Sequence, residues 1–146
     1  MFTKLRILTA SFVLFISTAA CADLAIITHP SSDTGKIDIL NVRKLFLGER
    51  KSFPNGVHAI PINHVVGSPD RKEFFSSVLN MPESNHTRHW QRKISKGTGH
   101  SPTERDSYEA VLKSVANTPG SISYIDSSKV NNTVKVLLTI SGFDAV

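Results

Sequence analysis

Apolar positions along the chain switch between the spacing of strands and the spacing of helices. Leu24 to Pro30 (LAIITHP) is a compact, β-branched run closed by a proline, which predicts a buried strand. Turn-forming residues follow, and a helix ending at Gly48 is then predicted by apolar residues at helical spacing, namely Ile37, Leu40, Val42, Leu45 and Phe46. The chain therefore begins as strand, loop and helix.

A second unit of the same kind follows the charged loop ERKSFPNG. Val57 to Asn63 (VHAIPIN) is predicted to be a strand despite Pro61. Ser68 is expected to cap the next helix, Pro69 suits its first position, and an apolar face continues to Asn80. This repetition favours a sheet with helices packed against it.

The remainder continues the alternation. A third helix is expected from about Pro82, and the stretch SKGTGHSPTE after it is expected to be irregular because glycine and proline crowd it. A fourth helix should end before Pro119, and strands are predicted at Ser121 to Asp126 and at Val134 to Ile140. The whole pattern predicts an α/β fold whose sheet is covered on two faces.

The first 22 residues have the pattern of a secretory signal peptide. Lys4 and Arg6 precede the apolar stretch from Ile7 to Ile16, and Ala20 and Ala22 supply the small residues of a cleavage site. The apolar stretch is about half as long as the ~30 Å hydrocarbon core of a membrane. We therefore expect an exported chain with a single domain at 23–146, in the periplasm or another extracytoplasmic location.

Cys21 leaves a second N-terminal processing route open. Lipoproteins are cleaved just before a cysteine that then carries the lipid, and in that case Cys21 would attach the protein to a membrane. Cleavage after Ala22 would instead leave a chain without cysteine, and thus without disulfides or thiolate chemistry.

Charge excludes one class of partner. Without Lys4 and Arg6 the chain carries 15 basic and 12 acidic residues, and the basic residues are spread among the acids. A nucleic-acid binder normally shows a denser basic stripe with interleaved aromatic residues. We expect no nucleic-acid partner, whereas small anions are compatible with this charge.

Several phrases in order resemble the phosphate-binding proteins of ABC uptake systems. They are RKLFLGERKSFPNG, PINHVVGSPDRKEFFSSVLN, the tryptophan at Trp90, KGTGHSP and VANTPGSISYID, and they cover the chain from Leu24 to about Leu138. The similarity is greatest to short exported relatives that keep about one lobe of that two-lobed fold. The resemblance implies a single periplasmic-binding-protein-like lobe, a mixed sheet flanked by helices, and phosphate or a similar oxyanion as ligand.

The sequence departs from the family pattern at two places. Where the transport proteins have a stretch resembling Asp-Gly-Ser-Gly-Thr, whose amides and hydroxyls hold phosphate, Pro69 removes one amide donor. Ser123 replaces the last glycine of a phrase similar to PGAIGY.

The start of the second helix is the principal candidate for an anion site. Gly67, Ser68, Asp70 and Arg71 surround backbone amides that lack helical partners and carry partial positive charge. Arg71 would add a forked donor suited to phosphate, although Asp70 competes for the same positive end. The alternative is a plain cap, with Asp70 satisfying the helix dipole and Arg71 solvated on the surface.

Further donors are expected from two loops. Ser31 and Ser32 follow the first strand, and ligands of open α/β sheets usually sit beyond the carboxyl ends of strands. Thr98 belongs to a short glycine loop. The alternative for each is an ordinary turn.

Other polar groups predict no metal, cofactor or catalytic site. His86 and His89 lie three apart on a helix but lack an evident third ligand, so they are expected to be solvated. Trp90, Phe74 and Phe75 are expected in the core. No nucleophile elbow, HExxH, P-loop or paired-carboxylate motif is present, and we expect a protein that is not an enzyme.

Two functions remain open. One lobe offers only half of a cleft, whereas tight sites enclose roughly 70–90% of a ligand, so phosphate binding on the order of millimolar is expected. The alternative is an interaction module that uses the half-cleft to dock a permease or another envelope protein. Pro69 and Ser123 motivate that alternative.

Overall fold

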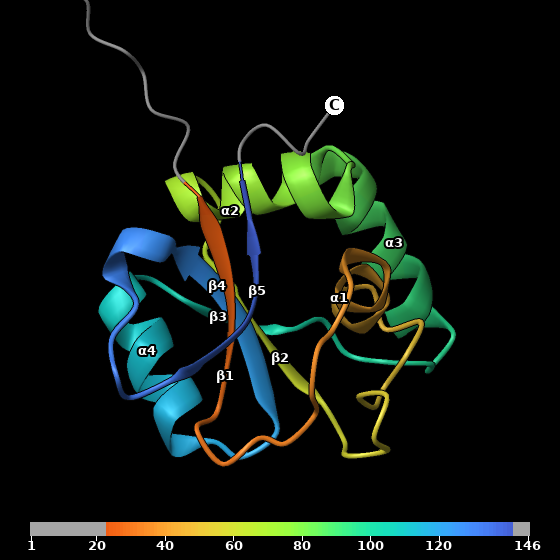
Figure 1. The fold of residues 1–146 in the computed structure, drawn as a ribbon. Coiled ribbons are helices and arrows are strands. Elements are labelled where there is room, and N and C mark those ends of the chain that lie inside the picture. The colour runs from red at the N-terminus through yellow and green to blue at the C-terminus, as the bar shows by residue number, and fades with distance from the viewer. Residues whose placement is uncertain (1–22, 142–146) are drawn as a thin grey trace, which may run out of the picture.

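The computed structural model describes residues 23–141, so the proposed signal peptide and Cys21 lie outside it. Within this range, no helix has the length and apolar character needed to cross a membrane. Helices and strands follow one another along the chain (Figure 1) as β1 (Leu24–Thr28), α1 (Ile39–Phe46), β2 (Ile60–His64), α2 (Pro69–Phe74), η1 (Phe75–Leu79), α3 (Glu83–Ser95), β3 (Thr103–Arg105), α4 (Tyr108–Asn117), β4 (Ser121–Asp126), η2 (Ser127–Lys129) and β5 (Lys135–Ile140).

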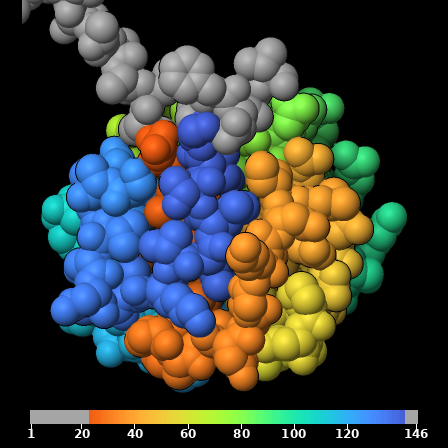
Figure 2. Space-filling model, viewed as in Figure 1, coloured from red at the N-terminus to blue at the C-terminus, as the bar shows by residue number. Residues whose placement is uncertain are grey.

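The five strands form one mixed sheet in the order β3-β2-β4-β1-β5. β2 runs parallel to β3 and β4, whereas β1 runs antiparallel to both β4 and β5. In the view of Figure 2, β5 and the segment before it hide most of β1, the strand beside which β5 pairs at the edge of the sheet. The predicted α/β class, with a mixed sheet flanked by helices, is confirmed.

Helices cover both faces of the sheet (Figure 1), and this explains why β1 is buried at every position and apolar from Leu24 to Ile27. Leu24 and Ile26 join one core cluster with residues of α1, α2 and η1. Ala25 and Ile27 point to the opposite face and join a cluster with α4. Successive side chains of a strand alternate between faces, so a strand covered on both faces has no polar side.

The start of β2 differs from the sequence-based expectation for a physical reason. The predicted strand began at Val57, but β2 begins at Ile60, whose amide bonds to Gly120 O at 2.9 Å. The backbone nitrogen of the next residue, Pro61, faces β3 instead of β4. β3 pairs with β2 only from Ile62 onward. Pro61 therefore removes no ladder bond, although β2 lies inside the sheet.

The expectation that SKGTGHSPTE is wholly irregular is wrong at its end. Thr103 and Glu104 belong to β3, which pairs in parallel with β2 through Arg105. All three residues of this strand are polar, so the sequence shows no apolar periodicity that would predict it. Backbone pairing with β2 forms it.

The helix expected from Ser68 to Asn80 is confirmed, with one change of geometry. Its first part is α2, and the second part, η1, has π-helical hydrogen bonding. Asn80 ends the helix with φ of 50°, in the left-handed region that asparagine tolerates.

Candidate functional site

The direction of β1 separates the seven candidate anion-binding residues into two groups. Thr28 pairs with Ile122 near the beginning of β4, so Ser31 and Ser32 follow β1 at the end of the sheet where β2 and β4 start. Ser68 instead follows the carboxyl end of β2. The loops after β1 and β2 would meet only if the two strands ran in the same direction. Because β1 runs antiparallel to β4 and β2 runs parallel to it, the expectation that these loops meet is wrong.

Thr98 also lies apart from Ser68. It precedes β3 and lines a cavity with Ile60 and Pro61, at the beginning of β2. The turn after β1 is closed locally, because Ser32 N donates to His29 O at 3.0 Å and Ser31 Oγ lies 2.7 Å from His29 Nδ1. Ser31, Ser32 and Thr98 therefore do not contribute to one site with the start of α2.

The start of α2 uses most of its polar groups within the protein. Ser68 caps the helix by accepting the Arg71 amide at 3.5 Å, and its Oγ is also 3.5 Å from His64 Nδ1. Asp70 accepts the Asp126 amide at 3.3 Å. Within the described part of the chain, no hydrogen bond engages the amides of Gly67 and Asp70. These two amides are the donors left for a ligand.

Arg71 is neither solvated nor free to receive an anion. The residue is 2% exposed, and its guanidinium lies over the Phe75 ring at 4.6 Å. Both Glu83 oxygens accept from it, at 2.6 and 2.8 Å. Nη1 donates to Glu104 Oε1 at 3.0 Å and to His64 O at 2.7 Å. Both sequence-based interpretations of Arg71 are therefore wrong, because the side chain ties α2 to α3, β3 and the end of β2.

The charge around Arg71 is negative overall. Glu83 and Glu104 supply two carboxylates to the one Arg71 guanidinium, and Asp70 adds a further carboxylate in the first turn of α2. A hydrogen bond from Arg71 lowers the pKa of Glu83, which keeps this carboxylate ionised. A further anion placed here would meet this excess negative charge.

A buried polar network, which the hydrophobic pattern of the sequence did not reveal, lies beneath the helix start. The His64 ring donates from Nε2 to Tyr124 O at 2.6 Å, so its Nδ1 faces Ser68 as an acceptor. The Tyr124 hydroxyl bonds to Asn63 Oδ1. Burial lowers the pKa of His64 and raises that of Tyr124. The available signal was the pair Asn63-His64, two polar residues at the end of an apolar strand.

Ser123 has a structural role in the same region. Its hydroxyl donates to Ile62 O at 2.7 Å and so links β4 to β2. Ser123 therefore adds a side-chain hydrogen bond between two neighbouring strands of the sheet.

His86 is buried and His89 is half-buried and bonded to the backbone, which corrects the expectation that both are solvated. His86 is buried, and its Nε2 accepts from the Trp90 indole at 3.2 Å. His89 donates from Nε2 to Leu47 O at 2.7 Å. Within residues 23–141, no group of three or more His, Cys, Asp or Glu side chains could hold a metal ion. Trp90, Phe74 and Phe75 are buried, as predicted.

The burial of His86 predicts a loss of stability in weak acid. Burial, and then the positive charge of Arg71, lower the pKa of His86 from 6.5 to about 4. As the pH falls from about 6.5 to about 4, the His86 imidazole binds a proton in the unfolded chain but stays neutral in the folded chain. We therefore expect the free energy of unfolding, measured with urea, to fall over this range.

The variant His86→Gln provides the control for this titration. Its slope between pH 6.5 and 4.5 should be smaller, because glutamine does not titrate but can still accept from the indole. Some slope should remain, since the pKa of His64 is lowered in the same direction. Equal slopes for both proteins would contradict the assignment to His86.

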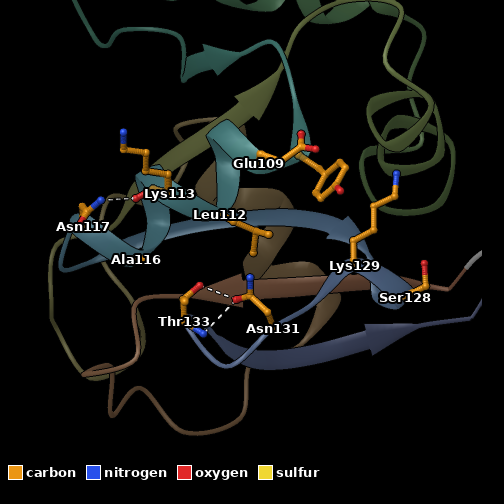
Figure 3. Close-up of a pocket in the computed structure, with 10 residues that line it drawn as sticks. Glu109, Leu112, Lys113, Ala116, Asn117, Ser128, Lys129, Asn131 and Thr133 are labelled. Atoms are coloured by element: carbon orange, nitrogen blue, oxygen red, sulfur yellow. Dashed lines mark hydrogen bonds between the residues drawn. The ribbon is translucent and has the colours of Figure 1, made fainter.

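Another surface hollow, of about 670 Å³, lies between α4 and the segment 127–133 (Figure 3). Its lining mixes Glu109 with Lys113 and Lys129, so neither sign of charge dominates. Lys129 Nζ lies 4.4 Å from the centre of the Tyr108 ring, and Asn131 Oδ1 accepts from Thr133. None of the candidate anion-binding residues lines it.

No protein-family model matches the sequence, and no curated protein matches it. Solved structures do share the fold. One, described as a phosphate ABC transporter substrate-binding protein with bound phosphate from Clostridium perfringens, has a TM-score of 0.64 and 15% sequence identity, over 81% of this chain and 46% of its own.

Two further structures agree with this comparison. An ABC-type phosphate transport receptor from Vibrio cholerae has a TM-score of 0.63 at 12% identity, and covers 81% of this chain and 47% of its own. PstS from Borrelia burgdorferi has a TM-score of 0.63 at 20% identity, with 81% and 48% covered. The described chain therefore has the fold of about one half of the phosphate ABC transporter substrate-binding proteins, and it resembles a single lobe of them.

Proposed function

We propose that this chain is an extracytoplasmic binding module that docks another envelope protein through its half-cleft. The half-cleft comprises the segment 66–71 after β2, together with Glu83 and Glu104. The observation that carries the proposal is the pairing of Arg71 with these two glutamates. Such pairing withdraws the main cationic donor from any small anion and leaves two partly exposed carboxylates at the surface.

The composition of the half-cleft indicates the chemistry of its partner. Val66 is 66% exposed, and the side chains of Glu83 and Glu104 are 39% and 45% exposed. A partner segment with an apolar side chain flanked by lysine or arginine would complement this surface. The chain spans about half the length of the similar solved structures, so a second lobe does not cover this surface within residues 23–141.

Weak binding of phosphate at the same place is the second candidate function. It is supported by the fold shared with proteins named for phosphate, one of them solved with bound phosphate. The amides of Gly67 and Asp70, with the Ser68 hydroxyl, would be its donors. The neighbouring carboxylates oppose it, so we expect dissociation constants of about 1 mM or weaker.

A phosphate titration separates the two functions. For a docking module, we expect the thermal unfolding midpoint to be the same in phosphate and in chloride of equal ionic strength. The amide signals of residues 67–72 should not move at tens of millimolar phosphate. Saturable movement of the Gly67 and Asp70 amide signals would favour the oxyanion binder instead.

Site-specific crosslinking tests the docking surface itself. A photo-crosslinking amino acid replaces Val66 in cells that export the protein, and it replaces Leu40 of α1, which is also exposed, as the matched control. We expect one discrete adduct from position 66, with the crosslink located by mass spectrometry in a basic segment of the partner. Adding Glu104→Lys should lower the yield at least fivefold. An adduct that forms equally from position 40, or that is indifferent to this charge reversal, would contradict the proposal.

A further inference from the structure

A second concave site lies at the opposite end of the sheet from the half-cleft. It is a cavity of about 390 Å³ between the end of α1, the beginning of β2 and the loop 98–103. Leu45, Ala59 and Trp90 provide buried apolar surface within it. Its position separates it from Ser68 and Arg71, so it is independent of the docking surface proposed above.

The wall formed by Trp90 is fixed in place by several contacts. The ring packs so closely on Gly48 that a Cβ there would lie 2.7 Å from the indole, and Gly48 has φ of 68°. The indole also donates to His86, while Lys93 Nζ donates to Gly48 O at 3.3 Å. Because α3 is held against the end of α1 in this way, the cavity is preformed.

The side chains that line this cavity include basic groups and no acidic group. The basic groups are Arg50, Lys51, His58 and His100, and three separate segments contribute them. The Ala59 amide donates to Lys51 O at 2.9 Å, and Ser52 bridges to His58, so the segments 50–52 and 58–59 are held side by side. A cluster of this kind attracts negative charge.

Two backbone groups add to these donors. Within the described chain, no hydrogen bond engages the amides of Gly99 and His100 in the adjoining loop. One Arg50 nitrogen, Nη1, donates to Asn41 at 2.8 Å, which orients the guanidinium and leaves its other donors available. The Thr98 hydroxyl already donates to Lys93 O, but its oxygen can still accept.

We propose that this cavity binds an organic anion, a molecule that carries a phosphate or carboxylate group on a ring-shaped apolar body. The basic side chains and loop amides would hold the anionic group, and the body would lie against Trp90 and Leu45. The cavity volume is several times that of an inorganic phosphate ion, so the bare ion would leave the apolar surface unfilled. Ligand sites commonly combine such apolar walls with a few convergent polar groups.

The test uses the fluorescence of Trp90, because the chain contains a single tryptophan. The mature protein is titrated with phenyl phosphate, benzoate and inorganic phosphate at constant ionic strength. We expect a saturable change with phenyl phosphate in the millimolar range or below, and binding of inorganic phosphate at least fivefold weaker. Benzoate binding equal to that of phenyl phosphate would extend the ligand class to carboxylates, whereas weaker benzoate binding would restrict it to phosphate esters. The absence of saturation by both organic anions at tens of millimolar would overturn the proposal.

Variants assign the binding to the basic groups. The double variant Arg50→Gln with Lys51→Gln should weaken phenyl phosphate binding at least tenfold, and His100→Asn on the exposed loop should weaken it at least twofold. Lys113→Gln, at the other surface hollow, should bind as the unchanged protein does. Thermal unfolding midpoints establish that each variant is folded, and His100→Asn carries the test if the double variant is not. Unchanged affinity in the folded variants of the cavity would refute the site.

Discussion

Arg71→Met is expected to lower the free energy of unfolding by about 2–4 kcal/mol. Removing one partner of a buried ion pair typically costs about 3–5 kcal/mol. The lower part of our range applies because the Glu83 and Glu104 side chains are 39% and 45% exposed and can regain water. His64 O would also lose a donor at 2.7 Å. Urea unfolding followed by Trp90 fluorescence measures the change.

The neighbouring residue supplies the control for this experiment. Lys72 is exposed, and Lys72→Met removes the same charge from the next position of α2, with an expected change within about 0.5 kcal/mol. Arg71→Lys should recover only part of the loss, since one ammonium group cannot replace a fork that holds both oxygens of Glu83. A loss below about 1 kcal/mol for Arg71→Met would show that the Arg71 network is not a principal support of the fold.

Phe74→Ala is expected to lower the free energy of unfolding by about 3–5 kcal/mol, the usual cost of truncating a buried phenylalanine. The Phe74 ring stacks on Tyr124 with centroids 3.9 Å apart and meets the edge of Phe46 at 4.7 Å. No solvent reaches the side chain, so its removal leaves a cavity between α1, α2 and β4. Urea unfolding of the variant gives the value.

Two further substitutions interpret the result for Phe74. Phe74→Leu keeps most of the apolar volume and should retain more than half of the lost stability. Leu40→Ala removes an exposed side chain of α1, and its effect should be within about 0.5 kcal/mol. If Phe74→Ala cost no more than Leu40→Ala, the stack on Tyr124 would not belong to the stabilising core.

Local signals in the sequence predicted the individual elements well. Ser68 does cap the second helix and Pro69 does occupy its first turn, because capping depends on residues only a few positions apart. The strand at Ser121–Asp126 has the predicted bounds. Each of these features is encoded within one short segment, so its hydrophobic pattern and turn residues identify it.

The candidate site could not be predicted in the same way. Arg71 lies 12 positions from Glu83 and 33 from Glu104, and no pattern within a short segment predicts these ion pairs. Strand direction is likewise set by the whole chain: antiparallel β1 moves Ser31 and Ser32 away from Ser68. The three-residue β3 exists because β2 offers it hydrogen-bonding partners.

The sequence by itself determined the order of most strands and helices, the helix caps and the apolar residues of the core, since these follow from spacing and from residues near one another in the chain. Only the tertiary structure decided which charged side chains come together at each site. Folding places Glu83 and Glu104 against Arg71, and it gathers Arg50, Lys51, His58 and His100 around one cavity. The physical reason is that Coulomb interactions depend on distance in space, which a linear pattern of residues does not specify.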